Sequence, residues 1–157
     1  MKVYLKIKRA IRFLFYKHLS VEDQLKVKQQ LNEDNIIRLF WQLSMQDRHH
    51  SVEVLERTIN KTFDKELLTL KELESLNSLF TLCLLHDIGK STSHFSWVFR
   101  IFSELRIINN SKSELYLNHE QIGLSQLEKY SVDEKTINYY KKELLQNKHF
   151  VLDKTDY

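Results

Sequence analysis

The sequence predicts an all-α protein, and two observations carry that prediction. The 157-residue chain has two glycines and no proline, whereas average usage would give about 11 and about 8. Short strands and tight turns depend on those residues, which argues strongly against a β-sandwich or β-barrel. Apolar residues also recur at helical spacing along most of the chain. We therefore expect a single compact bundle of about seven helices, in which 1–30 form a helical extension packed on a core of 31–157.

The first half of the chain is expected to form four helices. An apolar stripe running to about Leu19 predicts an amphipathic first helix. Ser20, with Asp23 three residues later, is typical of a capped helix start and predicts a short second helix. Further apolar faces predict helices at about 34–43 and 47–62.

The second half is expected to contain the core. The nearly apolar run 79–85 follows helix-like sequence and predicts the buried end of a central helix that begins near Leu67. Cys83 lies in this run and is expected to be an inert core thiol, because burial raises the pKa of a thiol. A loop is expected at 108–114, which is rich in Asn, Ser and Lys. Later helices are expected at three places: 93–105, 117–129 and 133–145.

Charge and composition bear on the class of partner. The net charge of +3, from 24 basic and 21 acidic residues, is too small to predict nucleic-acid binding. One cysteine excludes an internal disulfide and suits a reducing compartment. No stretch reaches about 18 apolar residues, and the basic N-terminal segment 1–16 suits a core helix better than a secretory signal or a lipid-bound helix. We expect a cytoplasmic protein without a transmembrane segment.

The two glycines stand in informative positions. Gly89 closes His86-Asp87-Ile88-Gly89, and Gly123 closes a five-residue segment that begins at His119. Glycine suits places where a helix ends or where two backbones approach closely. Each histidine is therefore expected to lie beside a close contact between segments.

The pair His86-Asp87 is a candidate metal site. It follows the most apolar run, and a bound cation would offset the cost of burying an unpaired carboxylate. Imidazole and carboxylate together suit Mn, Fe, Co, Ni or Zn. His50 lies 36 residues before His86, and His119 lies 33 residues after it. Ligands from separate helices that meet inside a bundle are a common way to build such a site.

Three segments resemble motifs of the HD-domain superfamily of metal-dependent phosphohydrolases: Asp47–Val54 (DRHHSVEV), Leu84–Lys90 (LLHDIGK) and His119–Gly123 (HEQIG). The chain is most similar to small stand-alone bacterial members with the His-Asp-Ile-Gly form, and the resemblance extends from about Leu31 to the C-terminus. It implies an all-helical HD fold and a centre with one or two divalent transition-metal ions.

The resemblance also implies the ligands. His50 matches the first, because a serine follows it directly, and His86 and Asp87 match the central pair. His119 matches a histidine offered to a second metal. The distal aspartate is expected at Asp156, because the preceding Val151–Thr155 resembles the family's apolar approach to Ala-Asp, with Asp153 as the fallback.

One part of the family pattern is missing. Relatives with two metals often carry another histidine late in the penultimate helix, where this chain has Glu143 and Leu144, with His149 several residues beyond. Either Glu143 or His149 replaces that ligand, or the second metal is weak or absent.

The activity implied is hydrolysis of a phosphomonoester or phosphodiester, expected to be that of a nucleotide, by metal-activated water. Asp87 is expected to hold the metal and orient the nucleophile, and Lys90 to contact the phosphate. Arg48 and His94 are further candidates for substrate binding. Lys90 could instead be a solvated residue at a helix end.

Three alternatives stay open at this stage. The chain could be an HD-fold binding or regulatory module with little or no turnover. It could be a di-iron oxygenase, since some relatives of the fold oxidise their substrates. It could also be a basic nucleic-acid-binding protein, which the mild net charge disfavours.

Overall fold

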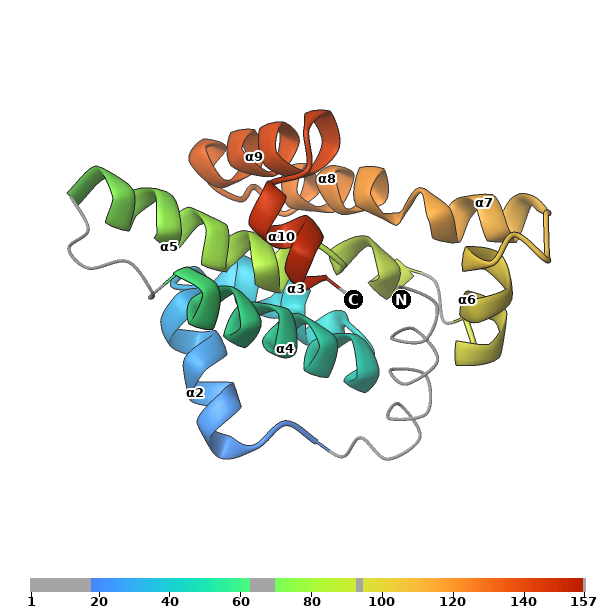
Figure 1. Cartoon of the computed structure of the whole chain (residues 1–157), viewed down its shortest axis with the longest axis horizontal. Coiled ribbons are helices and arrows are strands. Elements are labelled where there is room, and N and C mark those ends of the chain that lie inside the picture. Colours follow the sequence, from blue (N-terminus) through green and yellow to red (C-terminus); the bar gives the residue numbers. More distant parts are fainter. Residues whose placement is uncertain (1–17, 63–69, 93–94, 157) are drawn as a thin grey trace.

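The computed structural model describes residues 18–62, 70–92 and 95–156, and over these residues it contains helices and no strand. The prediction of an all-α fold is thus confirmed. Figure 1 shows the helices packed around α5, with α6 and α7 extending to one side. The elements are α2 (Val21–Gln30), α3 (Asp34–Gln42), α4 (Met45–Thr62), α5 (Leu70–Leu85), η1 (Ile88–Thr92), α6 (Trp97–Glu104), α7 (Ser111–Leu117), α8 (His119–Lys129), α9 (Glu134–Tyr140), η2 (Lys141–Gln146) and α10 (Phe150–Thr155).

Several expected features lie outside the described residues. These are the first helix up to residue 17, the start of the central helix before residue 70, and His94. Among the residues that the structure does describe, no helix has both the length and the apolar character needed to cross a bilayer.

The expected loop at 108–114 is partly helical. Helix α7 begins at Ser111, because the side chain of Asn110 accepts a hydrogen bond from the backbone N–H of Ser113 at 2.9 Å. Asparagine is a favoured N-cap residue, so the same polar sequence that predicted a loop instead starts a helix. Figure 1 shows α7 and α8 following one another along nearly the same line.

The chain after residue 133 also differs from the single helix expected there. Helix α9 ends at Tyr140, and the next six residues form the π-helical segment η2. A further helix, α10, follows, and the ring of His149 caps it by accepting from the backbone N–H of Val151 at 3.3 Å. At six residues α10 is too short for its apolar spacing to predict it.

Helix α10 is fixed against α4. Arg57 donates to the carbonyl oxygen of Thr155 at 3.0 Å, and the hydroxyls of Thr58 and Thr155 lie 3.0 Å apart inside the protein. Val151 and Leu152, which belong to α10, are buried. Asp156, the residue that follows α10, is therefore held in place although it lies close to the end of the chain.

Both glycines lie where η1 meets α8. A Cβ on Gly89 would overlap the carbonyl oxygen of His119 and lie 2.6 Å from the backbone nitrogen of Gly123. A Cβ on Gly123 would overlap the hydroxyl of Tyr140 and lie 2.9 Å from the side chain of Ile88. Neither glycine has a positive φ. The reason for glycine at both places is therefore space between backbones, as the sequence suggested, and not an unusual backbone conformation.

Gly89→Ala should destabilise the protein by about 1–3 kcal/mol, because the added methyl group meets backbone atoms that cannot turn aside. Ser125→Ala on the exposed face of α8 is the control, and its effect should stay within about 0.5 kcal/mol. Urea unfolding of both variants measures the difference. An unchanged midpoint for Gly89→Ala would mean that η1 and α8 do not pack this closely.

Candidate metal centre

Five side chains that the sequence singled out meet in the structure, and they come from four separate segments. His50 lies on α4, His86 and Asp87 form the turn between α5 and η1, His119 begins α8, and Asp156 follows α10. Ligand atoms of the first three, all buried, lie within 4.8 Å of one another.

His86 is oriented by the helix that it follows. Its Nδ1 lies 2.8 Å from the carbonyl oxygen of Cys83, so Nδ1 carries the hydrogen and donates. Nε2 is buried and has no hydrogen-bond partner among the described residues. It faces Asp87 Oδ2 at 3.6 Å and Asp156 Oδ1 at 3.7 Å. In a neutral ring this nitrogen presents a lone pair to two carboxylate oxygens, an arrangement that calls for a proton or a cation between them.

His119 is held in a similar way. Its Nδ1 lies 2.8 Å from the carbonyl oxygen of Tyr116, and its Nε2 lies 3.1 Å from Asp87 Oδ1. Histidines that bind metals commonly donate their second ring N–H to a backbone carbonyl, which fixes the ring and the tautomer. Both His86 and His119 have that arrangement. The close packing at Gly89 brings His119 within reach of Asp87.

His50 and Asp156 complete the cluster. His50 Nε2 lies 2.9 Å from Asp156 Oδ1 and 3.9 Å from Asp87 Oδ2. The rings of His50 and His86 meet edge to face with their centroids 5.4 Å apart. Asp156, and not the exposed Asp153, is thus the distal aspartate that reaches the cluster.

Two lysines lie against the carboxylates. Lys90 Nζ lies 2.6 Å from Asp87 Oδ2, and its side chain is only 9% exposed, so the alternative of a solvated lysine is wrong. Lys148 Nζ lies 2.8 Å from Asp156 Oδ2. Lys148 was not predicted from the sequence, because the π-helical turn and α10, which position it, were not predicted.

The charges in the cluster shift one another's pKa values. Burial alone would raise the pKa of Asp87, but Lys90, His86 and His119 outweigh it and hold that pKa well below its usual range. The pKa of Asp156 is also well below its usual range, because His86 and His50 outweigh the effect of burial. Burial lowers the pKa of His86, but the charges of Asp87 and Asp156 outweigh this effect and raise it overall. Both carboxylates are therefore ionised at neutral pH.

Two spacings within the cluster are compatible with a divalent transition-metal ion. Two ligands each about 2.1 Å from an ion lie about 3.0 to 4.2 Å apart, depending on the angle between them. Nε2 of His86 and Oδ2 of Asp87, at 3.6 Å, and Nε2 of His50 and Oδ2 of Asp87, at 3.9 Å, fall in that range. Buried imidazoles with ionised carboxylates are a suitable set for Mn, Fe, Co, Ni or Zn, and this cluster could hold such an ion.

The remaining site candidates from the sequence, Arg48, Glu143 and His149, make other contacts. Arg48 donates from Nε to the carbonyl oxygen of Leu43 at 2.8 Å, and its guanidinium lies over the ring of Trp41. Glu143 pairs with Lys142 at 3.2 Å. His149 uses Nδ1 to cap α10, as described above. A role for Arg48 in substrate binding, or for Glu143 or His149 at a second metal, stays a prediction.

An ion pair near the cluster was also not predicted from the sequence. Arg100 on α6 pairs with the buried Asp47 on α4 at 2.5 Å, and its guanidinium lies over the ring of Tyr116. Lys90 Nζ lies 5.7 Å from the centroid of the same ring. The pair therefore ties α6 and α4 together beside the cluster.

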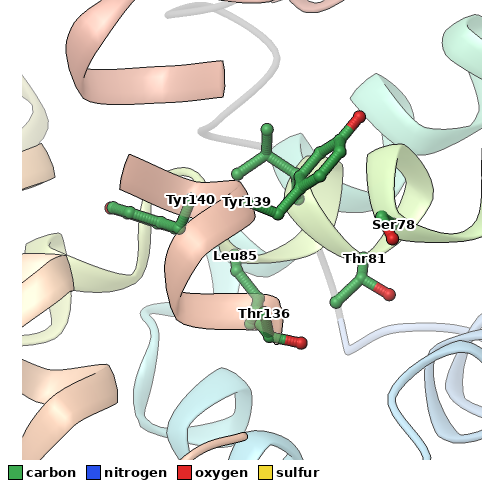
Figure 2. A pocket seen from close by; sticks show the side chains of 7 residues that line it. Ser78, Thr81, Leu85, Thr136, Tyr139 and Tyr140 are labelled. Carbon is green, nitrogen blue, oxygen red and sulfur yellow. The ribbon is translucent and has the colours of Figure 1, made fainter. Parts of the chain in front are cut away.

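Two cavities lie apart from these residues. The smaller, with room for about 10 Å³, is lined by residues of α5 and α9, and Figure 2 shows Tyr139 and Tyr140 leaving α9 there in opposite directions. It is large enough for about one water molecule. The larger, about 560 Å³, lies between α2 and α4. None of the candidate metal-ligating residues lines either cavity, so neither cavity is part of the candidate metal centre.

Comparison of the chain with models of protein families, with curated proteins and with solved structures gives no match.

The raised pKa of His86 predicts how the stability of the metal-free protein depends on pH. A group whose pKa is higher in the folded than in the unfolded state contributes stability below its unfolded pKa, 6.5, and that stability is lost as the pH rises through the folded pKa. Thermal unfolding of the metal-free protein should therefore show a falling midpoint above pH 6.5. His86→Gln should remove most of this slope, and the exposed His18→Gln should keep it. Equal slopes for the wild-type protein and His86→Gln would contradict the geometry.

Cys83 is expected to be unreactive in the native protein. Burial raises the pKa of this thiol to about 12, because its effect outweighs the hydrogen bond to Thr58, which lowers that pKa. A disulfide reagent at pH 8 should therefore leave the folded protein unmodified and label one thiol per chain in guanidinium. Rapid labelling without denaturant would show that the end of α5 is open.

Proposed function

We propose that the protein is a metal-dependent phosphohydrolase of the HD-domain type. The observation that carries the proposal is the convergence of three imidazoles and two ionised carboxylates from four segments, with a buried Nε2 of His86 that lacks a hydrogen-bond partner among the described residues. These residues occupy the motifs whose resemblance to the HD superfamily led us to expect a metal there.

His50, His86, Asp87 and Asp156 would hold the ion, and His119 lies beside them. A divalent ion in this place supplies Lewis acidity toward a phosphoryl oxygen and lowers the pKa of water. Asp87 also reaches His119 through Oδ1, which suits it to orient a nucleophile. Lys90 presents an ammonium group next to Asp87, where it can offset the negative charge on the phosphoryl oxygens.

A second candidate function is a binding or regulatory module without turnover. Lys90 and Lys148 already neutralise both carboxylates in the structure, so the cluster is electrostatically satisfied to a large extent without an ion. Ion pairs of this kind could stabilise a fold that has no catalytic role.

A metal-binding measurement distinguishes a metal centre from a set of ion pairs that only stabilises the fold. Titration of the chelated protein with Mn²⁺ in a calorimeter should give a saturable site. His50→Gln and Asp87→Asn should each weaken it by more than the roughly 10- to 100-fold expected for a supporting residue. His49→Gln alters the neighbouring histidine and should bind as the wild type does. Unchanged binding in His50→Gln would contradict the assignment of this centre.

An assay of hydrolysis then distinguishes an enzyme from a binding or regulatory module without turnover. The Mn²⁺-, Co²⁺- or Fe²⁺-loaded protein should release phosphate from members of a panel of nucleotide monoesters and diesters. Asp87→Asn, checked for an intact fold by circular dichroism, should lower kcat/KM at least 100-fold, or by about 2.7 kcal/mol. No turnover with any of the three metals, in a protein that binds them, would favour the module.

A further inference from the structure

We infer that Lys148 is an anion-binding residue of the metal centre, and that with Lys90 it selects a phosphate group with three terminal oxygens, a phosphomonoester, over a phosphodiester. This inference rests on the proposed function and narrows its substrate class.

Lys148 is placed at the centre by its backbone. It lies between η2 and α10, and both flanking residues are tied to η2: Asn147 N–H donates to the carbonyl of Lys142 at 3.1 Å, and His149 N–H donates to that of Glu143 at 2.7 Å. The side chain donates to Asp156 Oδ2 at 2.8 Å. These contacts make Lys148 part of the cluster and distinguish it from an unanchored surface lysine.

The two oxygens of Asp156 point to different partners. Oδ1 faces His50 at 2.9 Å and His86 at 3.7 Å, whereas Oδ2 takes the bond from Lys148. The oxygen on the imidazole side can therefore serve a metal while the other stays on the lysine. An ammonium has three N–H donors, and Asp156 uses one of them.

The exposed edge of the cluster is where Lys148 lies. The side chains of His50, His86 and Asp87 are 2–3% exposed, whereas those of His119, Asp156 and Lys148 are 17%, 20% and 30% exposed. An anion that approaches from solvent meets this edge first. It would find the Lys148 ammonium on the side of Asp156 and the Lys90 ammonium on the side of Asp87.

An ion held by the cluster would add its charge to the two ammonium groups, Lys90 on Asp87 and Lys148 on Asp156. A phosphomonoester has three unesterified oxygens and two negative charges above its second pKa of about 6. A phosphodiester has two such oxygens and one charge, so it accepts fewer charge-assisted hydrogen bonds and is attracted less strongly by the same cationic groups. Charge-assisted hydrogen bonds to phosphate are among the stronger ones, so this difference favours the monoester.

The test measures binding, with Mn²⁺, methyl phosphate and dimethyl phosphate as probes at pH 8. The Mn²⁺-loaded wild type should bind methyl phosphate at least about tenfold more tightly than dimethyl phosphate. Lys148→Met should lose about tenfold or more of its methyl phosphate affinity and most of the preference. Its Mn²⁺ affinity should stay equal or rise, since a positive charge is removed. Lys148→Arg should restore the preference in part, and Lys142→Met, an exposed lysine of η2, should behave as wild type.

The outcomes are distinguishable. If Lys148→Met binds Mn²⁺ more weakly but methyl phosphate normally once loaded, Lys148 only positions Asp156 and the inference is wrong. Equal binding of the two phosphates by the wild type would also overturn it. A wild-type protein that binds no Mn²⁺ would instead refute the proposed function. Matching unfolding midpoints for Lys148→Met and Lys142→Met exclude misfolding as the cause of a loss.

Discussion

The burial of the Asp87 carboxylate is the constraint on which the rest of the structure depends. An ionised carboxylate inside a protein is costly unless cations and hydrogen-bond donors surround it. Here Lys90 lies against Oδ2 and His119 against Oδ1, while the Nε2 atoms of His50 and His86 lie 3.9 and 3.6 Å away. Asp156 adds a second negative charge to the same cluster, and the pKa values of both aspartates stay well below their usual range. Aliphatic side chains would often stabilise a purely structural core at least as well, and this is the reason for proposing a functional role for the cluster.

Contacts between segments that are far apart in the sequence bring these groups together. Glycine at positions 89 and 123 lets η1 and α8 approach closely enough for His119 to reach Asp87. Arg57 and Thr58 fix α10 on α4, and this contact places Asp156 beside His50. The geometry of the cluster is therefore set by the same packing that stabilises the bundle.

The all-α class, and the five residues that the structure brings together in the candidate cluster, could be predicted from the sequence, because both depend on local patterns. The scarcity of glycine and proline and the helical spacing of apolar residues indicated the class. Two of the histidines are marked by the rare glycines that follow them. Helix α7 was not predicted because asparagine is as common in loops as at the N-cap position that Asn110 occupies. Helix α10 was not predicted because six residues are too few to show a helical spacing of apolar residues. Lys148 was missed for a different reason: it is one of 24 basic residues, and only the π-helical turn before it brings its side chain to Asp156.

The most direct measurement of the central claim is anomalous diffraction from crystals of the full chain soaked in Mn²⁺. The account predicts an anomalous peak bounded by His50, His86, Asp87 and Asp156, with Nε2 of His86 among the atoms that contact it. The contradictory result is a well-ordered cluster without a peak, in which Lys90 and Lys148 keep their bonds to the two carboxylates and a proton on His86 takes the place assigned to the metal.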